Sequence, residues 1–500
     1  MKILNAEQTH LVDAYTIANE PIKSIDLMER ASFACSSWIL TSFSKNQHFY
    51  VFCGMGNNGG DGLAIARQLY DAGKEVTCYI VPFSSAGSTD FETNKQRLID
   101  LKIDLTYLTN KEQLQTLQKN SLIIDAIFGS GLSKAPQGIA ADVIDEINKS
   151  SLTKISIDIS SGLYCTDNSN NNYHNVVQAD YTLALHLPKL AQLLPSNHPY
   201  VGNLQVLPIG LNNEIIDNIE SPHRLTTINV ARQILKSRSK FSHKGNYGHT
   251  CIIAGSLGKM GAAVLAVKAA LRAGSGLVSA RIPKCGIDIM QTSVPEAMVL
   301  ANQGQDELKY SINHGKFTIG IGPGIGISKH TSDFLEALLD KANLQLVLDA
   351  DALNIIADNP EFIKLIPIQS ILTPHPKEFE RIVGMWDNDN QKLELLTNLS
   401  KKSNSIIVLK GAHTVIACEG KLHFNNTGNP GMAAAGSGDC LTGILTALLS
   451  QGYEPLEAAM LGVFLHGLAG DIAKTKQSEE SLIASDIIDN LGEAYNYLRT

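Results

Sequence analysis

Short apolar segments alternate with helical patterns over residues 49 to 210. The apolar segments are FYVFCG, EVTCYIV, SLIIDAIFG, KISIDIS, YTLALHL and NLQVLPIG. Helical patterns such as DGLAIARQLYDAG and GIAADVIDEINK lie between them, and LNAEQTHLVDAYTIANE and SIDLMERASFACSSWIL precede them. Because such alternation is typical of a mainly parallel sheet covered on both faces, we expect a three-layer α/β/α unit.

The same pattern restarts after residue 245, with HTCIIAGS, the Ala-rich helical segment GAAVLAVKAALRAG, GLVSARIP, KFTIGIGPG, LQLVLDAD, SILTPHP, SIIVLKG and the hairpin-like HTVIACEGKLHFNN. A chain of 500 residues exceeds the size at which one hydrophobic core usually keeps growing. The apolar periodicity weakens between residues 211 and 245, which indicates a linker. We therefore expect two α/β domains, residues 1–220 and 225–500, with the boundary near residue 222.

Charge and cysteine usage exclude several classes of partner. The net charge of −8 is spread without long runs, so nothing indicates binding to nucleic acid or to an anionic membrane surface. The first residues lack the apolar core of a secretion signal, and no uncharged apolar run reaches the roughly 18 residues of a membrane span. The eight cysteines form no C-x-x-C pair, so neither a disulfide framework nor a zinc site is indicated. We expect a cytoplasmic homo-oligomer that binds small molecules.

The segment GMGNNGGDG, residues 54 to 62, raises the question of a dehydrogenase. Gly54, Gly56 and Gly59 have the G-x-G-x-x-G spacing of a dinucleotide-binding turn. Such a turn needs an acidic residue about 20 residues on, at the tip of the next strand, where this chain has VPF at 81 to 83. The side-chain oxygens between the glycines indicate polar chemistry or a bound ion instead.

Three polar clusters, NNGGDG, DAIFGSG and DISSG, follow predicted strands of the first domain. In open α/β sheets, ligands bind outside the carboxyl ends of the strands. Asn58, Asp125 and Ser161 offer hard oxygen ligands to an alkali cation, although each of them alone is explained by a turn or a helix cap. Asp158 ends an apolar strand in the same way and is the better candidate for general acid/base chemistry.

These clusters, together with LMERA at 27 to 31, make the first domain similar to the NAD(P)H-hydrate epimerase family, often called the YjeF N-terminal domain. The resemblance implies a Rossmann-like fold, potassium bound by Asn58, Asp125 and Ser161, and substrate contact by Asp158. The residues implied to bind the hydrated cofactor are Asn57, Asn58, Gly59, Gly60, Asp61, Gly129, Ser130, Gly131, Leu132, Ser133, Lys134, Ala135 and Asp158. On this reading the glycine-rich turn does meet a nicotinamide dinucleotide, but a damaged one.

The second domain contains AAAGSGDCLTG, residues 433 to 443. A Gly-Ser-Gly turn that opens a helix exposes backbone N–H groups and the positive helix end, which suits a transferring phosphoryl group. Asp439, in the first turn of that helix, is then placed to take a proton from an attacking hydroxyl. The same residues are also explained by a purely structural role, namely a tight turn followed by an acidic residue at the start of a helix.

Together with GPGIG, LDADALN, TPHPKEFER, KGAHTVI and TGNPGM, this turn resembles the ADP-dependent NAD(P)H-hydrate dehydratase family, which has a ribokinase-like fold. The resemblance implies that the hydrate is bound by Ala263, Gly324, His375 and Asp439, and the adenine nucleotide by Lys410, Gly411, Ala412, His413, Thr414 and Gly438. The family's loop usually reads P-H-P-G-E, whereas this chain has Lys377 in place of the glycine, which leaves the local backbone course open.

The two resemblances imply a fused enzyme that repairs hydrated NADH and NADPH. The first domain would interconvert the R and S epimers at C6, and the second would dehydrate the S epimer. That step would use phosphorylation by ADP or ATP with Mg²⁺, with Asp439 as the base, followed by loss of phosphate. Two other hypotheses stay open: a ribokinase-like kinase of a small alcohol or vitamin precursor, since such kinases share GSGD, and a first domain that only senses nucleotides or binds a partner. GNNGGDG and KGAHTVI favour the repair enzyme.

Overall fold

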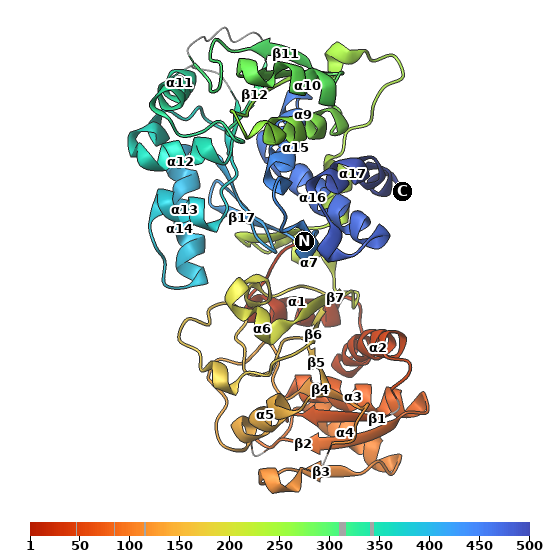
Figure 1. Cartoon of the computed structure of the whole chain (residues 1–500). Coiled ribbons are helices and arrows are strands. Elements are labelled where there is room, and N and C mark those ends of the chain that lie inside the picture. Colours follow the sequence, from red (N-terminus) through yellow and green to blue (C-terminus); the bar gives the residue numbers. More distant parts are fainter. Residues whose placement is uncertain (47, 85, 115–116, 310–316, 341–344) are drawn as a thin grey trace. The chain divides into compact units, whose positions relative to one another are not determined.

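The computed structural model describes residues 1–46, 48–84, 86–114, 117–309, 317–340 and 345–500. These residues form two compact units (Figure 1). The amino-terminal unit comprises Lys2–Ser221 with Asn388–Asn390, and the carboxyl-terminal unit comprises Met1, Pro222–Asp387 and Gln391–Thr500. Two of the predicted strand segments begin at residues 316 and 344, which lie outside the described residues.

The amino-terminal unit contains a parallel sheet with the strand order β3-β2-β1-β4-β5-β6-β7. Its strands are β1 (His48–Cys53), β2 (Glu75–Ile80), β3 (Leu105–Tyr107), β4 (Leu122–Ala126), β5 (Thr153–Ile157), β6 (Tyr181–Leu185) and β7 (Asn203–Leu207). Its α-helices are α1 (Ala6–Asn19), α2 (Ser24–Ser42), α3 (Asn57–Asp71), α4 (Thr89–Asp100), α5 (Ile139–Lys149), α6 (His198–Val201) and α7 (Asn213–Asn218). The order of the strands reverses between β1 and β4, which is where ligands bind in such sheets.

The strand β1 is buried on both faces, as the near-continuous apolar run FYVFC predicts. Phe49 and Val51 pack in a core that includes residues of α2, α3 and α4, whereas Tyr50 and Phe52 pack in a core that includes α5. The helix α1 packs instead with α2 and with residues that follow β6 and β7, so it borders the carboxyl end of the sheet. The predicted three-layer α/β class is confirmed.

The carboxyl-terminal unit contains a larger sheet with the order β11-β10-β9-β12-β13-β14-β15-β16-β17-β8, in which β16 alone runs antiparallel to its neighbours. Its strands are β8 (His223–Thr226), β9 (His249–Ile253), β10 (Leu277–Ile282), β11 (Met298–Ala301), β12 (Thr318–Ile321), β13 (Leu346–Leu348), β14 (Ile371–Leu372), β15 (Ile406–Leu409), β16 (Val415–Cys418) and β17 (Lys421–Asn425). β16 and β17 form the predicted hairpin.

Helices cover this sheet, and four of them share one core. The α-helices of the unit are α8 (Ile228–Ile234), α9 (Met260–Arg272), α10 (Ile287–Ser293), α11 (Lys329–Leu339), α12 (Asp351–Asp358), α13 (Pro376–Val383), α14 (Asp389–Ser403), α15 (Ser437–Ser450), α16 (Pro455–Lys476) and α17 (Ala484–Arg499). Helices α9, α15, α16 and α17 pack together in the main core. Of the helices that the structure describes, α16 has the length and composition to cross a membrane, but 67% of its most apolar window is buried inside the unit. We therefore interpret α16 as a core helix.

The interpretation of residues 211 to 245 as a linker is wrong for much of that segment. It contains α7, the strand β8 and the helix α8. β8 pairs in parallel with β17, so this short segment completes one edge of the second sheet. Its four residues are too few to show a period-two pattern in the sequence, which is why the strand was missed.

Candidate active sites

The predicted cation ligands of the amino-terminal unit come together where the strand order reverses. Asp125, in β4, is fully buried. The hydroxyl of Ser161 donates to its carboxylate, and the Ser161 N–H donates to Oδ2 over 2.9 Å. The Nδ2 of Asn58 donates over 2.9 Å to the carbonyl oxygen of Phe128, whose own N–H donates to Ser161 Oγ over 2.8 Å. Phe128 thus links Asn58 to the Asp125–Ser161 pair.

Two features of this cluster fit a bound cation. The Oδ1 atom of Asn58 is buried and has no hydrogen-bond donor in the described part of the chain. Burial raises the pKa of Asp125, and the hydrogen bonds from Ser161 and Ser156 only partly oppose this. A buried carboxylate next to an unsatisfied amide oxygen is stabilised by a positive charge. Potassium, which binds oxygen ligands, would both contact the unsatisfied Asn58 oxygen and offset the charge of the Asp125 carboxylate.

A cavity of about 620 Å³ opens beside this cluster, at the carboxyl end of the sheet. The residues predicted to bind substrate that line it are Asn57, Asn58, Asp61, Gly129, Ser130, Gly131, Leu132, Ser133, Lys134 and Asp158. Three others, Gly59, Gly60 and Ala135, do not line it, and both of these glycines are buried at the start of α3. The two stretches named by the family resemblance therefore face one space.

Asp158 reaches this cavity from a strained backbone position. Its φ is +66°, a conformation that residues other than glycine adopt rarely and that clusters at functional sites. Its carboxylate forms an ion pair with Lys189, which is only 2% exposed, and accepts a hydrogen bond from the Ser130 N–H over 3.2 Å. The sequence motifs did not point to Lys189. The available signal was a single lysine within the mostly apolar stretch LHLPKLAQL, because a lysine is rarely buried without a partner.

The cavity holds further ionisable residues that the motifs did not predict or explain. His10 and Asp13, both on α1, line it. Burial, followed by the charge of Asp158, raises the pKa of Asp13 to about 6. Burial and the same charge raise the pKa of Asp61 well above its usual value. The cavity therefore combines carboxyl groups in different electrostatic settings, which acid/base chemistry requires.

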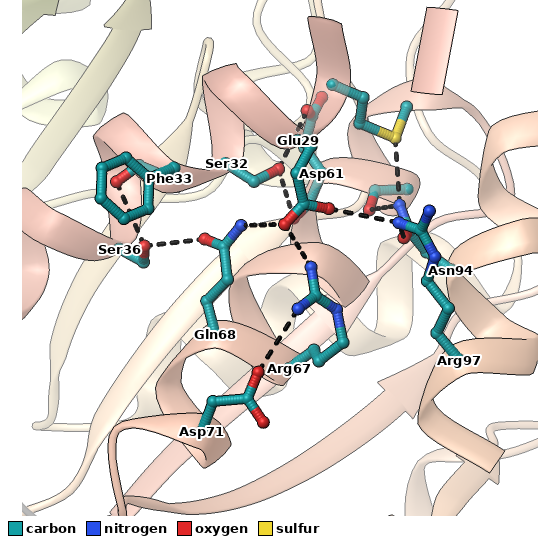
Figure 2. A network of polar contacts seen from close by, with 12 residues as sticks. Glu29, Ser32, Phe33, Ser36, Asp61, Arg67, Gln68, Asp71, Asn94 and Arg97 are labelled. Atoms are coloured by element: carbon teal, nitrogen blue, oxygen red, sulfur yellow. Dashed lines mark hydrogen bonds and ion pairs between the residues drawn. The ribbon is translucent and has the colours of Figure 1, made fainter. Parts of the chain in front are cut away.

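The LMERA segment contributes Glu29 to a network of polar contacts beside this site (Figure 2). Glu29, on α2, forms ion pairs with Arg67 of α3 and with Arg97 of α4, the latter over 3.2 Å, and accepts a hydrogen bond from Gln68 over 2.7 Å. Burial alone would raise the pKa of Glu29, but the contacts with Arg67 and Gln68 lower it. In the same network the Ser32 hydroxyl lies 3.4 Å from Asp61 Oδ1. Glu29 thus joins the three helices that carry one wall of the cavity.

In the carboxyl-terminal unit, the Gly-Ser-Gly turn opens α15 as expected, with Gly436 in a left-handed conformation just before it. Burial first, and then the charge of Asp349, raise the pKa of Asp439 to about 6, although Lys410 opposes this. Asp349 is 1% exposed and accepts from Lys410 Nζ and from Thr442 Oγ1, each over 2.8 Å. Asp349 therefore fixes Lys410 beside the helix that carries Asp439. The sequence analysis identified the segment LDADALN, which contains Asp349, but assigned no role to this residue.

The predicted nucleotide residues Lys410 and Gly438 are neighbours. A Cβ atom built on Gly438 would lie 3.4 Å from Lys410 Nζ and 3.6 Å from Asp349 Oδ2. The rest of the predicted segment, Gly411 to Thr414, forms the turn between β15 and β16. Within it, Thr414 Oγ1 donates to the carbonyl of Gly411 over 3.1 Å. Lys410 therefore directly precedes this turn and lies near Gly438 at the start of α15.

The predicted hydrate-binding residues Gly324, Ala263 and His375 lie in different surroundings. Gly324 follows β12 and adopts a φ of +64°, and a Cβ atom there would lie 3.1 Å from the carbonyl oxygen of Lys259 at the start of α9. Ala263, on α9, is fully buried. His375 is linked to Lys410 through Glu378, whose carboxylate lies 3.4 Å from His375 Nε2 and 3.9 Å from Lys410 Nζ.

The lysine that departs from the family's loop is accommodated without strain. His375 caps α13: its Nδ1 accepts from the N–H groups of Lys377 and Glu378 over 3.1 and 3.2 Å. Lys377 lies in the first turn of this helix and is not among the residues with positive φ. The position therefore does not need the conformational freedom of glycine, and the backbone course that the sequence left open is helical.

Comparison with known proteins assigns both units to families. Residues 24–191 match the family described as YjeF-related protein N-terminus, and residues 250–492 match the family described as NAD(P)H-hydrate dehydratase. The first match includes the polar clusters that border the amino-terminal cavity but not the lining residues of α1, and the second includes the Gly-Ser-Gly turn.

Whole-length relatives combine the same two parts. The chain is 35% identical to the bifunctional NAD(P)H-hydrate repair enzyme Nnr of Moorella thermoacetica, with 98% of this chain and 96% of that protein aligned. It is 31% identical to the protein of the same name from Thermofilum pendens, with 100% and 97% aligned. A crystal structure of the ADP/ATP-dependent NAD(P)H-hydrate dehydratase of Bacillus subtilis superimposes with a TM-score of 0.48 at 29% identity, covering 55% of this chain and 98% of that one. The chain belongs to the family of bifunctional NAD(P)H-hydrate repair enzymes, as its sequence motifs predicted.

Proposed function

We propose that this protein repairs hydrated NADH and NADPH in two steps. The amino-terminal unit interconverts the R and S epimers at C6, and the carboxyl-terminal unit dehydrates the S epimer with ADP or ATP. The observation that carries the proposal is that each unit gathers polar residues of its family's motifs at the carboxyl ends of parallel strands. Membership of a family whose members are named bifunctional repair enzymes supports it.

In the amino-terminal unit we assign binding and proton transfer to separate groups. Asn58, Asp125 and Ser161 would hold potassium, which would supply a fixed positive charge at the edge of the cavity. The loop of residues 129–135 and the start of α3 would bind the hydrated cofactor. Asp158, which forms an ion pair with Lys189 and lines the cavity, would accept a proton from the substrate.

In the carboxyl-terminal unit the dehydration chemistry follows from the leaving group. Hydroxide is a poor leaving group and phosphate is a good one, so the C6 hydroxyl is first phosphorylated. Asp439 takes the proton of that hydroxyl, and the N–H groups that open α15 stabilise charge on the transferring phosphoryl group. The lone pair of the ring nitrogen then expels phosphate and restores the cofactor. Lys410, whose Nζ lies near Gly438, would contact the nucleotide.

The carboxylates of this unit fit a magnesium ion that arrives with the nucleotide. Within the described residues, no cluster of three or more His, Cys, Asp and Glu side chains is arranged to hold a metal by itself. Magnesium commonly binds through one or two carboxylates together with substrate phosphates. Asp349 and Asp351 both raise the pKa of Asp439, and bound magnesium would offset that repulsion.

The test is product analysis with the full chain on a mixture of the two hydrate epimers. With ADP and Mg²⁺ we expect both epimers to be converted to reduced cofactor, and without nucleotide we expect interconversion only. Failure to restore the reduced cofactor, together with phosphorylation of a small alcohol supplied in a parallel assay with nucleotide, would favour a ribokinase-like kinase instead. Consumption of the S epimer alone would leave the amino-terminal unit without the proposed activity and would favour a sensing or binding role.

A further inference from the structure

The sequence motifs assign no residue of α1 to the site, yet α1 forms a wall of the amino-terminal cavity. Its lining residues are Thr9, His10, Asp13, Ala14 and Ile17. Their spacing places them on one face of the helix. His10 also lies against the substrate loop, since a Cβ atom built on Gly131 would be 3.7 Å from its Nε2. Asp13 is the carboxylate on this face, and it is half-buried.

No structural partner explains Asp13. In the part of the chain that the structure describes, its carboxylate accepts no hydrogen bond and forms no ion pair; its resolved interactions are electrostatic. A half-buried carboxylate without a partner costs free energy, so packing alone does not account for it. The charged and titratable groups that face it or share the cavity are His10, Asp61, Asp90, Lys134, Asp158 and Lys189.

We propose that Asp13 is a catalytic acid of the epimerisation, paired with Asp158 as the base across the cavity. This inference rests on the proposed function of the amino-terminal unit. The two carboxyl groups come from different elements, since Asp13 lies on α1 and Asp158 follows β5. Asp158 forms an ion pair with Lys189, whereas Asp13 forms none with the residues that the structure describes. The geometry therefore gives the two groups different surroundings around one substrate.

The chemistry at C6 requires one acid and one base. As the C6–N1 bond breaks, its electron pair goes to N1, which takes the proton of neutral Asp13. The C6 hydroxyl gives its proton to Asp158 and becomes a carbonyl oxygen. Rotation about the C5–C6 bond presents the other face of the carbonyl carbon to N1. Closure reverses both transfers, so N1 returns its proton to Asp13 and Asp158 returns its proton to the oxygen. The cycle consumes neither nucleotide nor oxidant.

The surroundings of Asp13 support the role of acid. Burial and the charge of Asp158 raise the pKa of Asp13 to about 6, against the opposing effects of His10 and Lys189. A proton is transferred most efficiently by a group whose pKa lies near the working pH. Neutralisation of Asp13 also removes its repulsion with Asp158. Pairs of carboxyl groups in different environments are the usual basis of opposite acid and base roles.

The experiment compares Asp13→Asn, Asp13→Glu and the control Glu7→Gln in the full chain. Glu7 is exposed, lies on the same helix and does not line the cavity. Conversion of the R to the S epimer is measured without nucleotide, and dehydration of the S epimer is measured with ADP and Mg²⁺. We expect Asp13→Asn to lower kcat of epimerisation by about 10²- to 10⁴-fold with little change in KM. Dehydration by the same variant and both activities of the control should stay native.

The pH profile distinguishes an acid from a residue that only shapes the cavity. Native epimerisation should slow as the pH rises through about 6, because the acid loses its proton. Asp13→Glu should keep this decline, and Asp13→Asn should abolish it. Native rates and a native profile in Asp13→Asn would overturn the proposal, as would a loss confined to KM. If Asp13→Asn melts early, the folded Asp13→Glu variant decides, and absence of the decline there would refute an acid. Failure of the native protein to epimerise would instead reject the proposed function.

Discussion

Replacement of Asp439 by asparagine is expected to stabilise the carboxyl-terminal unit at alkaline pH while it stops dehydration. The side chain stands in the first turn of α15, where the helix dipole favours a negative charge by about 0.3 to 1 kcal/mol. A cap that served only stability would therefore be weakened by the change. Burial and the neighbouring carboxylates of Asp349 and Asp351 oppose the charge, and they raise the pKa of Asp439 to about 6.

The size of the effect follows from the shift in pKa between the unfolded and the folded chain. The pKa rises from 3.8 to about 6, or roughly two units, and each unit corresponds to about 1.4 kcal/mol. The largest possible gain in the free energy of unfolding from Asp439→Asn is therefore about 3 kcal/mol. Because the side chain is partly exposed, we reduce it for solvent screening and for the lost dipole term to about 1 to 2 kcal/mol.

The sign depends on pH. A carboxyl group whose folded pKa is raised contributes stability that is fully present below the unfolded pKa of 3.8 and is lost as the pH rises through about 6. At pH 8 the ionised Asp439 thus destabilises the native unit, and at pH 4.5 it is largely neutral. Asparagine carries no charge at either pH. The gain from Asp439→Asn should be largest at pH 8 and clearly smaller at pH 4.5, and it should vanish only as the pH falls below the unfolded pKa of 3.8.

Thermal unfolding of the full chain at both pH values measures this gain. A change of about 1 to 2 kcal/mol corresponds to a Tm increase of roughly 2 to 6 °C in a unit of this size. The control is Asp288→Asn, which removes an exposed carboxylate from the first turn of α10 in the same unit. It should change the free energy of unfolding by less than about 0.5 kcal/mol at either pH.

Activity is measured on the same samples. Dehydration by Asp439→Asn should fall at least about 10²-fold, and epimerisation should stay native. The native dehydration rate should fall as the pH drops below about 6, because a protonated Asp439 cannot accept the proton of the hydroxyl. An asparagine variant that melts lower than the native chain at pH 8 and still turns over at the native rate would refute the reasoning and leave Asp439 as a helix cap.

Three further changes test other parts of the chain. Asp125→Ala should lower epimerisation at least about 10-fold and remove its dependence on potassium, with dehydration unchanged, as measured by rates in potassium and in a large organic cation. Glu29→Gln should lower the free energy of unfolding by about 1 kcal/mol, whereas Asp71→Asn, which breaks one exposed ion pair to Arg67, should change it by less than about 0.5 kcal/mol, both measured by denaturant unfolding at pH 7. Lys377→Gly should preserve dehydration and cost up to about 1 kcal/mol, since the position is helical.

Sequence reasoning correctly predicts that polar residues at the ends of neighbouring strands lie close together. Asp125 and Ser161 are 36 positions apart, yet a parallel sheet brings the carboxyl ends of β4 and β5 to one edge, where the Ser161 N–H donates to Asp125. The apolar runs predict the strands, and the polar residues after each run are expected at the carboxyl-terminal edge of the sheet. The same rule brings Asp349, after β13, to Lys410, after β15. Contacts of this kind can be predicted once the order and direction of the strands are known.

Residues outside the strand ends escape this reasoning. Asp13 lies on a helix ahead of the sheet, and its helical pattern indicates which face is apolar but not which element it covers. Lys189 follows β6 and is recognisable only once its ion pair with Asp158 is seen. Glu29 lies within a short motif, yet the reason for the motif is contact with α3 and α4, which is tertiary packing. These roles depend on how helices cover the sheet, and hydrophobic periodicity leaves that arrangement open.

The glycine fingerprint of the first unit shows why a motif shared with dehydrogenases need not share their chemistry. A Cβ atom on Gly59 would lie 1.8 Å from the carbonyl oxygen of Gly54, and one on Gly54 would lie 2.0 Å from that of Ile127. Both glycines are therefore required by the close approach of a strand, a turn and a helix. That geometry is common to any helix that begins directly after a buried parallel strand. The chemistry depends on the polar residues between and after the glycines, and here Asn58 and Asp61 face the cavity. Substitution of these two side chains should therefore change activity far more than it changes the fold.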